Sequence, residues 1–328
     1  MSTFLLVAIK SVVLVVILLT VFAYVMLFER KFLGFFQLRH GPNRTGPWGL
    51  FQPIADAVKL VFKEDIIPHD ADRLVYFIAP AVSLFVALAA YASIPIGPPV
   101  QIFGHTVELS ILNVNAGILV LLATTSLGVY GIALGGWASQ NKYSLLGSLR
   151  STAQMISYEL AMGMSLVGVL VMAGSLNPYD IVAAQERAWY ILLNPVGFIV
   201  FFISAVAEVN RIPFDLPEAE TELVSGYNTE FSGMRFAMYY MAEYINMLTM
   251  CSLVTLLYLG GWHGPSFIPL PPALWFALKV FLLVFVFYWM RATLPRLRYD
   301  RLMNLGWKVL LPLAALNLIV TAVVVALF

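Results

Sequence analysis

The chain has 328 residues, of which 61% are hydrophobic and 11% are charged, and its formal net charge is +1. Soluble domains average about half apolar and about a quarter charged residues, so this composition excludes a water-soluble globular protein and indicates an integral membrane protein. The single cysteine, Cys251, excludes an intrachain disulfide, and it cannot supply the roughly four thiolates that an iron–sulfur cluster needs.

Eight apolar runs predict membrane-spanning helices, because about 20 residues cross a ~30 Å hydrocarbon core. They lie near residues 4–28, 75–95, 115–137, 153–174, 195–210, 237–260, 273–291 and 308–328. The fifth run is short and ends in an acidic stretch. The first is too long for a cleaved signal peptide, and no small-residue cleavage site follows it. We therefore expect an all-α membrane protein that forms a single domain over residues 1–328.

The basic residues predict the orientation of these helices. Of 19 lysines and arginines, 16 fall in or at the edges of four alternate connecting segments. These segments are residues 29–73, 138–150, 208–235 and 291–308. The opposite loops contain only Arg187. The positive-inside rule therefore places the basic segments in the cytoplasm and both termini on the outer side.

Within the first basic segment, residues 50–63 have the pattern of an amphipathic helix. Gln52, Asp56, Lys59 and Lys63 recur at helical spacing and form one polar stripe beside an apolar face. A helix of this length extends about 21 Å, which is too short to cross the membrane. We expect it to lie flat in the cytoplasmic interface, where its simplest role is that of an anchor.

On the outer side, the sequence predicts two small elements. Residues 98–110 alternate around Gly104 and His105 and predict a β-hairpin. Residues 177–189 predict a short outer helix. We assign no chemistry to either element.

The sequence shows no pattern typical of a redox cofactor or a metal site. The histidines are His40, His69, His105 and His263, and they all lie in predicted loops or at span ends. A haem bundle needs axial ligands within its helices, and no glycine-rich dinucleotide fingerprint follows a strand. We therefore expect no cofactor, metal or catalytic residue in this chain alone.

Three carboxylates in the predicted spans are the strongest indication of function. Glu159, Glu208 and Glu243 all lie in the cytoplasmic half of the bilayer. An acid at the centre of a membrane helix costs roughly 2.5–3.5 kcal/mol, so such acids are usually functional. Their similar depth predicts a proton relay along the membrane plane. The alternative is that each acid makes a neutral, hydrogen-bonded contact between helices.

A second group of acids follows the fifth span. Asp215 and Glu218 have the spacing of a helix capping box, which explains these two locally. Glu220, Glu222 and Glu230 follow without lysines to balance them. The loop therefore holds more acids than capping alone requires.

Three long motifs of the sequence resemble a known family. They are "LFERKFLGFFQLRHGPNRTGPWGLFQPIADAVKLVFKED", "AEVNRIPFDLPEAETELVSGYNTEFSGMRFAMYYMAEY" and "RATLPRLRYDRLMNLGWKVLLPL". They resemble the H subunits of bacterial NADH:quinone oxidoreductase, the counterparts of subunit 1 of mitochondrial complex I. The resemblance extends over nearly the whole chain, including the eight predicted spans.

The resemblance implies a quinone site that includes the amphipathic helix. In that family the subunit joins the redox arm to the membrane arm and forms much of the chamber in which quinone is reduced. The first and sixth spans and the flat helix frame the entrance. The positions in this chain that match the quinone channel are Arg30, Gln37, Arg39, Asp56, Ala57, Lys59, Leu60 and Met241.

The resemblance also implies a proton path from the chamber toward proton-pumping subunits. The matching acids within the spans are Glu159, Glu208 and Glu243, and those of the loop beside the chamber are Asp215, Glu218, Glu220, Glu222 and Glu230. Arg211, between the two groups, is expected to hold one of these acids ionised.

The resemblance implies partners as well. The expected partners are other complex I subunits, of the peripheral arm and of the bacterial cytoplasmic membrane, together with membrane lipid. FMN and iron–sulfur clusters are expected on partner subunits. Quinone is the expected substrate, and no nucleic acid is expected. Two alternatives remain open. One is a related membrane component of another respiratory assembly or of a membrane hydrogenase. The other is a secondary ion transporter, which is expected to show repeated halves.

Overall fold

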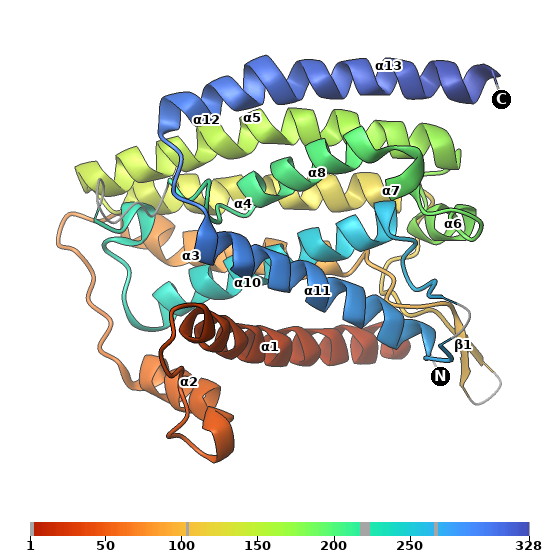
Figure 1. Ribbon diagram of the computed structural model, residues 1–328. Helices are drawn as coiled ribbons and strands as arrows, with labels where there is room; N and C mark the ends of the chain where they lie inside the picture. The colour runs from red at the N-terminus through yellow and green to blue at the C-terminus, as the bar shows by residue number, and fades with distance from the viewer. Residues whose placement is uncertain (1–2, 103–104, 217–223, 266–267, 328) are drawn as a thin grey trace.

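The computed structural model describes residues 3–102, 105–216, 224–265 and 268–327. The chain forms a helical bundle with one small hairpin (Figure 1). The helices are α1 (Thr3–Phe36), α2 (Gln52–Phe62), α3 (Arg73–Tyr91), α4 (Gly117–Ala138), α5 (Lys142–Ala173), α6 (Pro178–Ala184), α7 (Tyr190–Leu193), α8 (Pro195–Glu208), α10 (Gly233–Tyr258), α11 (Pro272–Thr293), α12 (Tyr299–Leu305) and α13 (Leu311–Leu327). Short helical turns lie at Pro47–Gly49, Gly226–Asn228 and Gly306–Leu310.

Seven helices within the described ranges are long and apolar enough to cross a membrane. They are α1, α3, α4, α5, α10, α11 and the continuous run Tyr299–Leu327. The chain is therefore a multi-pass membrane protein. The predicted span at 195–210 forms α8, an apolar helix of 14 residues, which extends only about 21 Å. An eighth crossing and the outer position of the termini thus stay predictions.

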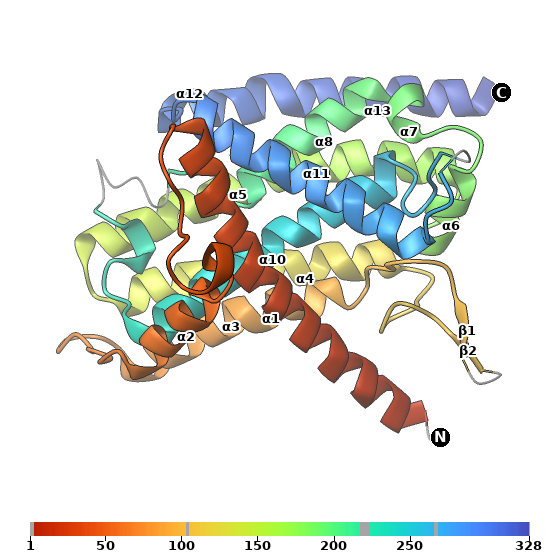
Figure 2. The ribbon, with the colours of Figure 1, turned by 60° about the horizontal axis from the view of Figure 1, so that its bottom comes forward.

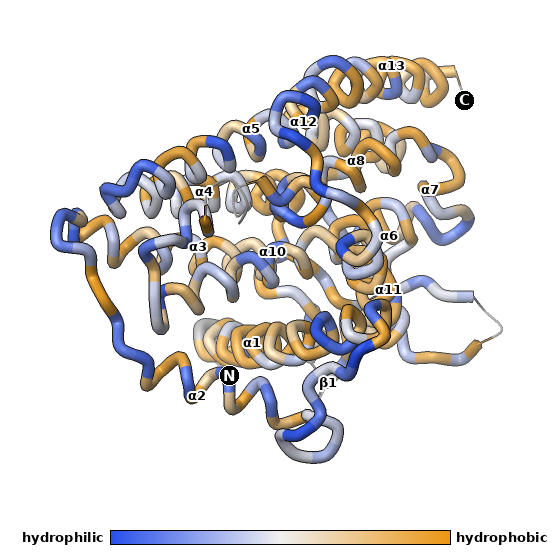
Figure 3. Tube along the Cα trace, turned by 60° about the vertical axis from the view of Figure 1, so that its left-hand side comes forward, coloured by the Kyte–Doolittle hydropathy of each residue, from blue (hydrophilic) through white to orange (hydrophobic). Residues whose placement is uncertain are grey.

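The polar and apolar parts of the bundle are separated along its length. Both termini, the hairpin and α6 lie at one end of the bundle, and α2 lies at the other (Figures 1 and 2). α1 and α13 are hydrophobic along most of their length, whereas the connecting segments are largely hydrophilic (Figure 3). This is the distribution expected of helices that face lipid and of loops that face water.

Helix α10 is the centre of the bundle. It packs against α1, α3, α8 and α11. In its most apolar stretch of 18 residues, 78% of the residues are buried, compared with 6% in that of α1. Two glycines of α4 allow close approach of its neighbours. A Cβ at Gly131 would overlap Ser83 of α3, and one at Gly135 would overlap the Tyr239 hydroxyl of α10. Small residues at such contacts are typical of membrane helix packing.

The three smaller predicted elements are confirmed. Residues 50–63 contain α2, and residues 177–189 contain α6, whose first turn is capped by the Asn177 side chain. The predicted hairpin consists of β1 (Val100–Ile102) and β2 (His105–Val107), which pair antiparallel with Val100 opposite Val107. The Lys10 ammonium of α1 donates to the Glu108 carbonyl at 2.8 Å and so ties α1 to the hairpin.

A buried lysine, Lys279, binds the turn that follows α10, at the same end of the bundle as the hairpin. The Lys279 ammonium of α11 donates to the carbonyls of Leu259, Gly261 and His263 at 2.5, 2.9 and 2.6 Å. It also lies 4.3 Å from the centre of the Trp189 ring. These carbonyls belong to the turn that follows the last residue of α10, Tyr258, and the ammonium gives each of them a hydrogen-bond partner in an apolar environment.

Replacing Lys279 by methionine is expected to lower the thermal stability of the protein. The substitution keeps the apolar stem but removes the donor for three carbonyls, and each unsatisfied buried group costs about 1–3 kcal/mol. The unfolding midpoint in detergent should therefore fall clearly. Lys308→Met, at an exposed position, is the control. Equal midpoints for the two variants would contradict this account of the helix end.

Candidate functional site

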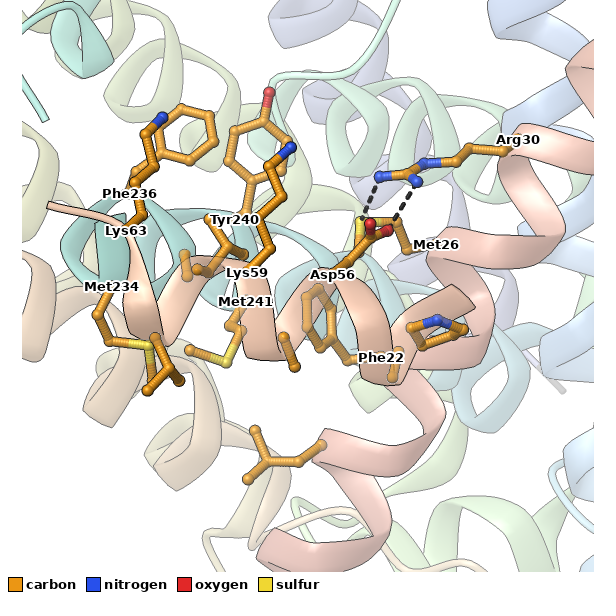
Figure 4. A pocket seen from close by; sticks show the side chains of 17 residues that line it. Phe22, Met26, Arg30, Asp56, Lys59, Lys63, Met234, Phe236, Tyr240 and Met241 are labelled. Carbon is orange, nitrogen blue, oxygen red and sulfur yellow. Dashed lines mark hydrogen bonds and ion pairs between the residues drawn. The ribbon is translucent and has the colours of Figure 1, made fainter. Parts of the chain in front are cut away.

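A cavity of about 520 Å³ lies between α1, α2 and α10 (Figure 4). Most of its wall is apolar, and Leu19, Phe22, Met26, Leu60, Met234 and Met241 contribute to it. Polar side chains are fewer, and Arg30, Asp56, Lys59, Lys63 and Tyr240 contribute these. The cavity can therefore bind a molecule that is mainly apolar and has a few groups that accept hydrogen bonds.

Polar contacts hold α2 against α1 and thereby form the cavity. Pro53 lies in the first turn of α2, where its missing N–H is tolerated. The predicted polar stripe faces α1 at Asp56, whose carboxylate accepts from the Arg30 guanidinium at 2.7 Å. Gln52 donates to the other Asp56 oxygen at 2.9 Å and accepts from Thr45 at 2.8 Å. The stripe is thus an attachment to α1 as well as a polar surface.

Six of the eight predicted quinone-channel residues line this cavity. They are Arg30, Asp56, Ala57, Lys59, Leu60 and Met241. Gln37 and Arg39 lie elsewhere, beyond the end of α1, where Arg39 Nε donates to Gln37 Oε1 at 2.7 Å. Arg39 lines a separate open hollow with His40 and Arg44.

A buried cluster of charges lies beside the cavity, with Glu29 at its centre. The Glu29 side chain is only 3% exposed. One carboxylate oxygen accepts from Arg211 at 3.3 Å and also from Arg291, and the other accepts from the Tyr244 hydroxyl at 2.6 Å. Buried charges need such partners because their removal from water costs several kcal/mol per ion.

Arg211 joins Glu29 to a second acid. Its Nε lies 2.7 Å from the Glu243 carboxylate, and its guanidinium lies 4.3 Å from the centre of the Tyr244 ring. Burial opposes the charged form of Arg211, but the Glu243 carboxylate and the Tyr244 hydroxyl outweigh burial and raise the pKa of the guanidinium. Arg211 therefore stays charged and favours ionised neighbours.

Two small cavities of about 30 Å³ each lie beside this cluster. Tyr240 lines both the large cavity and the first small one. Asn210 and Glu243 line both small cavities, and Glu208 lines the second. A volume of about 10–15 Å³ is enough for one water molecule, so each small cavity has room for water. We refer to their polar lining, from Arg211 and Glu243 to Glu208, as the row.

Glu208 and Glu159 extend the row. Glu208 ends α8 and is 6% exposed, and one of its carboxylate oxygens has no hydrogen-bond partner within the described residues. Glu159 of α5 accepts a hydrogen bond from the Ser126 hydroxyl of α4, and its carboxylate repels that of Glu208. The three predicted span acids are thus part of one region of the bundle.

The loop acids are only partly described. Asp215 lies 3.0 Å from the Arg296 guanidinium and lines the first small cavity. Glu230 accepts from the Asn141 amide at 2.5 Å. Glu218, Glu220 and Glu222, and with them the predicted capping box, lie outside the described residues.

Sequence reasoning missed three members of the charge cluster. Glu29 directly follows the first predicted span and Tyr244 lies in the sixth, the two spans expected to frame the quinone entrance, but neither residue is predicted from the sequence to contact Arg211, and Arg291 is not predicted at all. Glu29 did have a signal, because it is an acid directly after an apolar run. Within the described parts of the chain, no three His, Cys, Asp or Glu side chains are placed to hold a metal ion.

Comparisons with known proteins show what this chain is similar to. A family model described as NADH dehydrogenase matches residues 9–322. The chain is 53% identical to an H subunit of NADH-quinone oxidoreductase from Geobacter metallireducens over 312 residues, which cover 95% of this chain and 94% of that protein. It is 53% identical to the corresponding H subunit of Protochlamydia amoebophila over 303 residues, 92% of each chain. It is 52% identical to that of Deinococcus radiodurans over 337 residues, 99% of this chain and 84% of that protein.

Replacing Glu29 by alanine is expected to destabilise the protein severely. The change leaves the buried Arg211 with one carboxylate fewer, and breaking a buried ion pair costs about 3–5 kcal/mol; the partly exposed Arg291 also loses its partner. Glu29→Gln keeps the shape and some hydrogen bonds, so its effect should be smaller. The unfolding midpoint in detergent is the measurement, and exposed Glu186→Ala is the control. A Glu29→Ala midpoint equal to that of the control would refute a central role for Glu29.

Proposed function

The chain belongs to the NADH dehydrogenase family and is an H-type membrane subunit of NADH-quinone oxidoreductase; from this premise we propose that it forms much of the quinone chamber and conducts protons away from it. Other subunits of that complex are its partners. We further propose that it resides in the bacterial cytoplasmic membrane and receives electrons from an iron–sulfur cluster on a neighbouring subunit.

The large cavity suits a quinone in size and in polarity. A quinone has a long apolar tail and a headgroup with two carbonyl oxygens that accept hydrogen bonds. The apolar wall around Phe22, Met234 and Met241 suits the tail, and donors such as Arg30 and Tyr240 suit the headgroup oxygens. The volume of about 520 Å³ lies in the range of about 300–1,000 Å³ that is typical of ligand cavities.

Tyr240 provides the observation on which the coupling proposal rests. It lines the quinone cavity on one side and the cavity of Arg211, Asp215 and Glu243 on the other. Reduction of a quinone to a quinol takes up two electrons and two protons, and negative charge develops on the headgroup oxygens before the protons arrive. Ionisable groups next to that charge change their proton affinity in response.

The row of acids supplies a route for these protons. Glu243 is paired with Arg211, whereas Glu208 is buried further along the row beside Asn210. We infer that a proton moves between Glu243 and Glu208 through water in the second small cavity. Glu159, which repels Glu208 electrostatically, is the next acceptor toward the neighbouring membrane subunits.

Filling the cavity should block quinone reduction. Ala57 lines the cavity, and a tryptophan at this position would occupy space that the quinone needs. We expect Ala57→Trp to lower kcat/KM for quinone about tenfold or more, a loss of ~1.4 kcal/mol of transition-state binding. Ala55 lies on the same helix but does not line the cavity, so Ala55→Trp should have little effect. Oxidation of NADH by ferricyanide, measured in the same membranes, should be normal in both variants.

Replacing Glu208 by glutamine tests the proton route. The amide keeps the size of the side chain but cannot exchange a proton, and positioned proton donors contribute about 100-fold or more to rate. We expect proton translocation coupled to quinone reduction to fall roughly tenfold or more. Ferricyanide reduction should persist, and the exposed control Glu186→Gln should pump normally. An assembled Glu208→Gln complex that pumps at the full rate would remove Glu208 from the route.

A further inference from the structure

The end of the quinone cavity opposite Arg30 and Asp56 is lined by Lys63, Met234 and Phe236 (Figure 4). These residues come from two segments far apart in the sequence, namely the end of α2 and the start of α10. Neither Asp65, two residues after Lys63, nor Arg235, between Met234 and Phe236, lines the cavity. They instead join the two segments outside the cavity, by contacting each other.

Asp65 and Arg235 form an ion pair in which Arg235 Nη2 lies 3.0 Å from the Asp65 carboxylate. The Arg235 side chain is only 9% exposed, because it packs on the aromatic rings of α3. Its guanidinium lies 3.9 Å from the centre of the Phe77 ring and 5.0 Å from that of Tyr76. A guanidinium held between rings has little freedom, so its position also determines that of its carboxylate partner.

A second contact joins the same segments. The Ile66 N–H donates to the Ser232 hydroxyl at 3.2 Å. Gly233 begins α10 with φ +55, which favours glycine, and a Cβ at this position would lie 3.3 Å from the Lys63 carbonyl oxygen. The chain after α2 is therefore packed directly on the first turn of α10.

We propose that Asp65, Arg235 and Ser232 form a latch that fixes the distance between α2 and α10 and thereby positions the wall that contacts the quinone tail. This inference rests on the proposed quinone function of the cavity. The three residues are positioning residues and make no contact with the headgroup. Opening the latch lets residues 63–66 move and loosens the wall at Lys63 and Met234, whereas the Arg30–Asp56 end keeps its own contacts.

The test compares quinones with long and short tails in native membranes that contain the assembled complex. A long isoprenoid tail reaches the latch end, whereas a short-tailed quinone contacts mainly the headgroup end. Asp65→Asn should raise KM for the long-tailed quinone about fivefold, equivalent to ~1 kcal/mol, with kcat unchanged. KM for the short-tailed quinone should stay within about twofold of the unsubstituted protein.

Two further variants and a control complete the design. Asp65→Glu, which keeps the charge, should restore most of the affinity for the long tail. Ser232→Ala, which removes one hydrogen bond and leaves the ion pair, should raise the same KM by a smaller factor. It also provides the test if Asp65→Asn does not assemble. Asp70→Asn, an exposed acid of the same connection, should behave like the unsubstituted protein.

The outcomes separate the latch from other roles. An unchanged KM for the long-tailed quinone in assembled Asp65→Asn and Ser232→Ala overturns the latch. Equal losses of kcat with both quinones overturn it as well, because they indicate general destabilisation. Ala57→Trp tells which proposal fails: if it leaves both quinone reactions intact, the cavity is not the quinone site. If it blocks them while the latch variants have no effect, only the latch is wrong.

Discussion

The contact of the Glu29 carboxylate with Arg211, Arg291 and Tyr244 joins four parts of the chain inside an apolar bundle. Glu29 and Arg211 are too costly to bury unpaired, since an ion in such surroundings loses several kcal/mol of hydration, and Arg291 and the Tyr244 hydroxyl complete the contacts of the carboxylate. The four groups therefore have to meet, and α1, the segment after α8, α10 and α11 are placed accordingly. Both the large cavity and the row of small ones lie around this contact.

Helix α10 serves several surfaces at once because successive residues of a helix point about 100° apart. Tyr239 faces α4, where its hydroxyl donates to the Gly131 carbonyl at 3.0 Å. Tyr240 and Met241 face the large cavity, and Glu243 faces the small ones. About one and a half turns of α10 thus carry residues that line the large apolar cavity and residues that line the small polar ones. Under the proposed function, this closeness lets charge on the quinone headgroup act on the acids.

The sequence predicted the elements much better than the contacts between them. Seven spans, α2 and the hairpin follow from local hydrophobic patterns. Six of the predicted quinone-channel residues line one cavity, because the two motifs that contain them meet there. The partners of Glu29 lie 182 to 262 residues away, and no local pattern encodes which cation an acid meets. Gln37 and Arg39 lie beyond the end of α1 and contact each other instead of the cavity. Matching residues to a family motif does not show where a helix ends. The length of α8 depends on where the backbone turns at Val209 and Asn210, and hydropathy locates such a turn poorly.

The two ends of α10 are held in different ways, and this limits how the helix can move. At the hairpin end, the Gln185 amide donates to the Leu256 carbonyl and accepts from the Gly260 N–H, next to the carbonyls that bind Lys279. At the other end, the Arg235 guanidinium packs on the Tyr76 and Phe77 rings of α3. These contacts oppose sliding or tilting of the whole helix. Under the proposed function, rearrangements during turnover are therefore expected between the two ends of α10, as rotation of side chains such as Tyr240 and Glu243 or as local bending, and so close to the proposed quinone site.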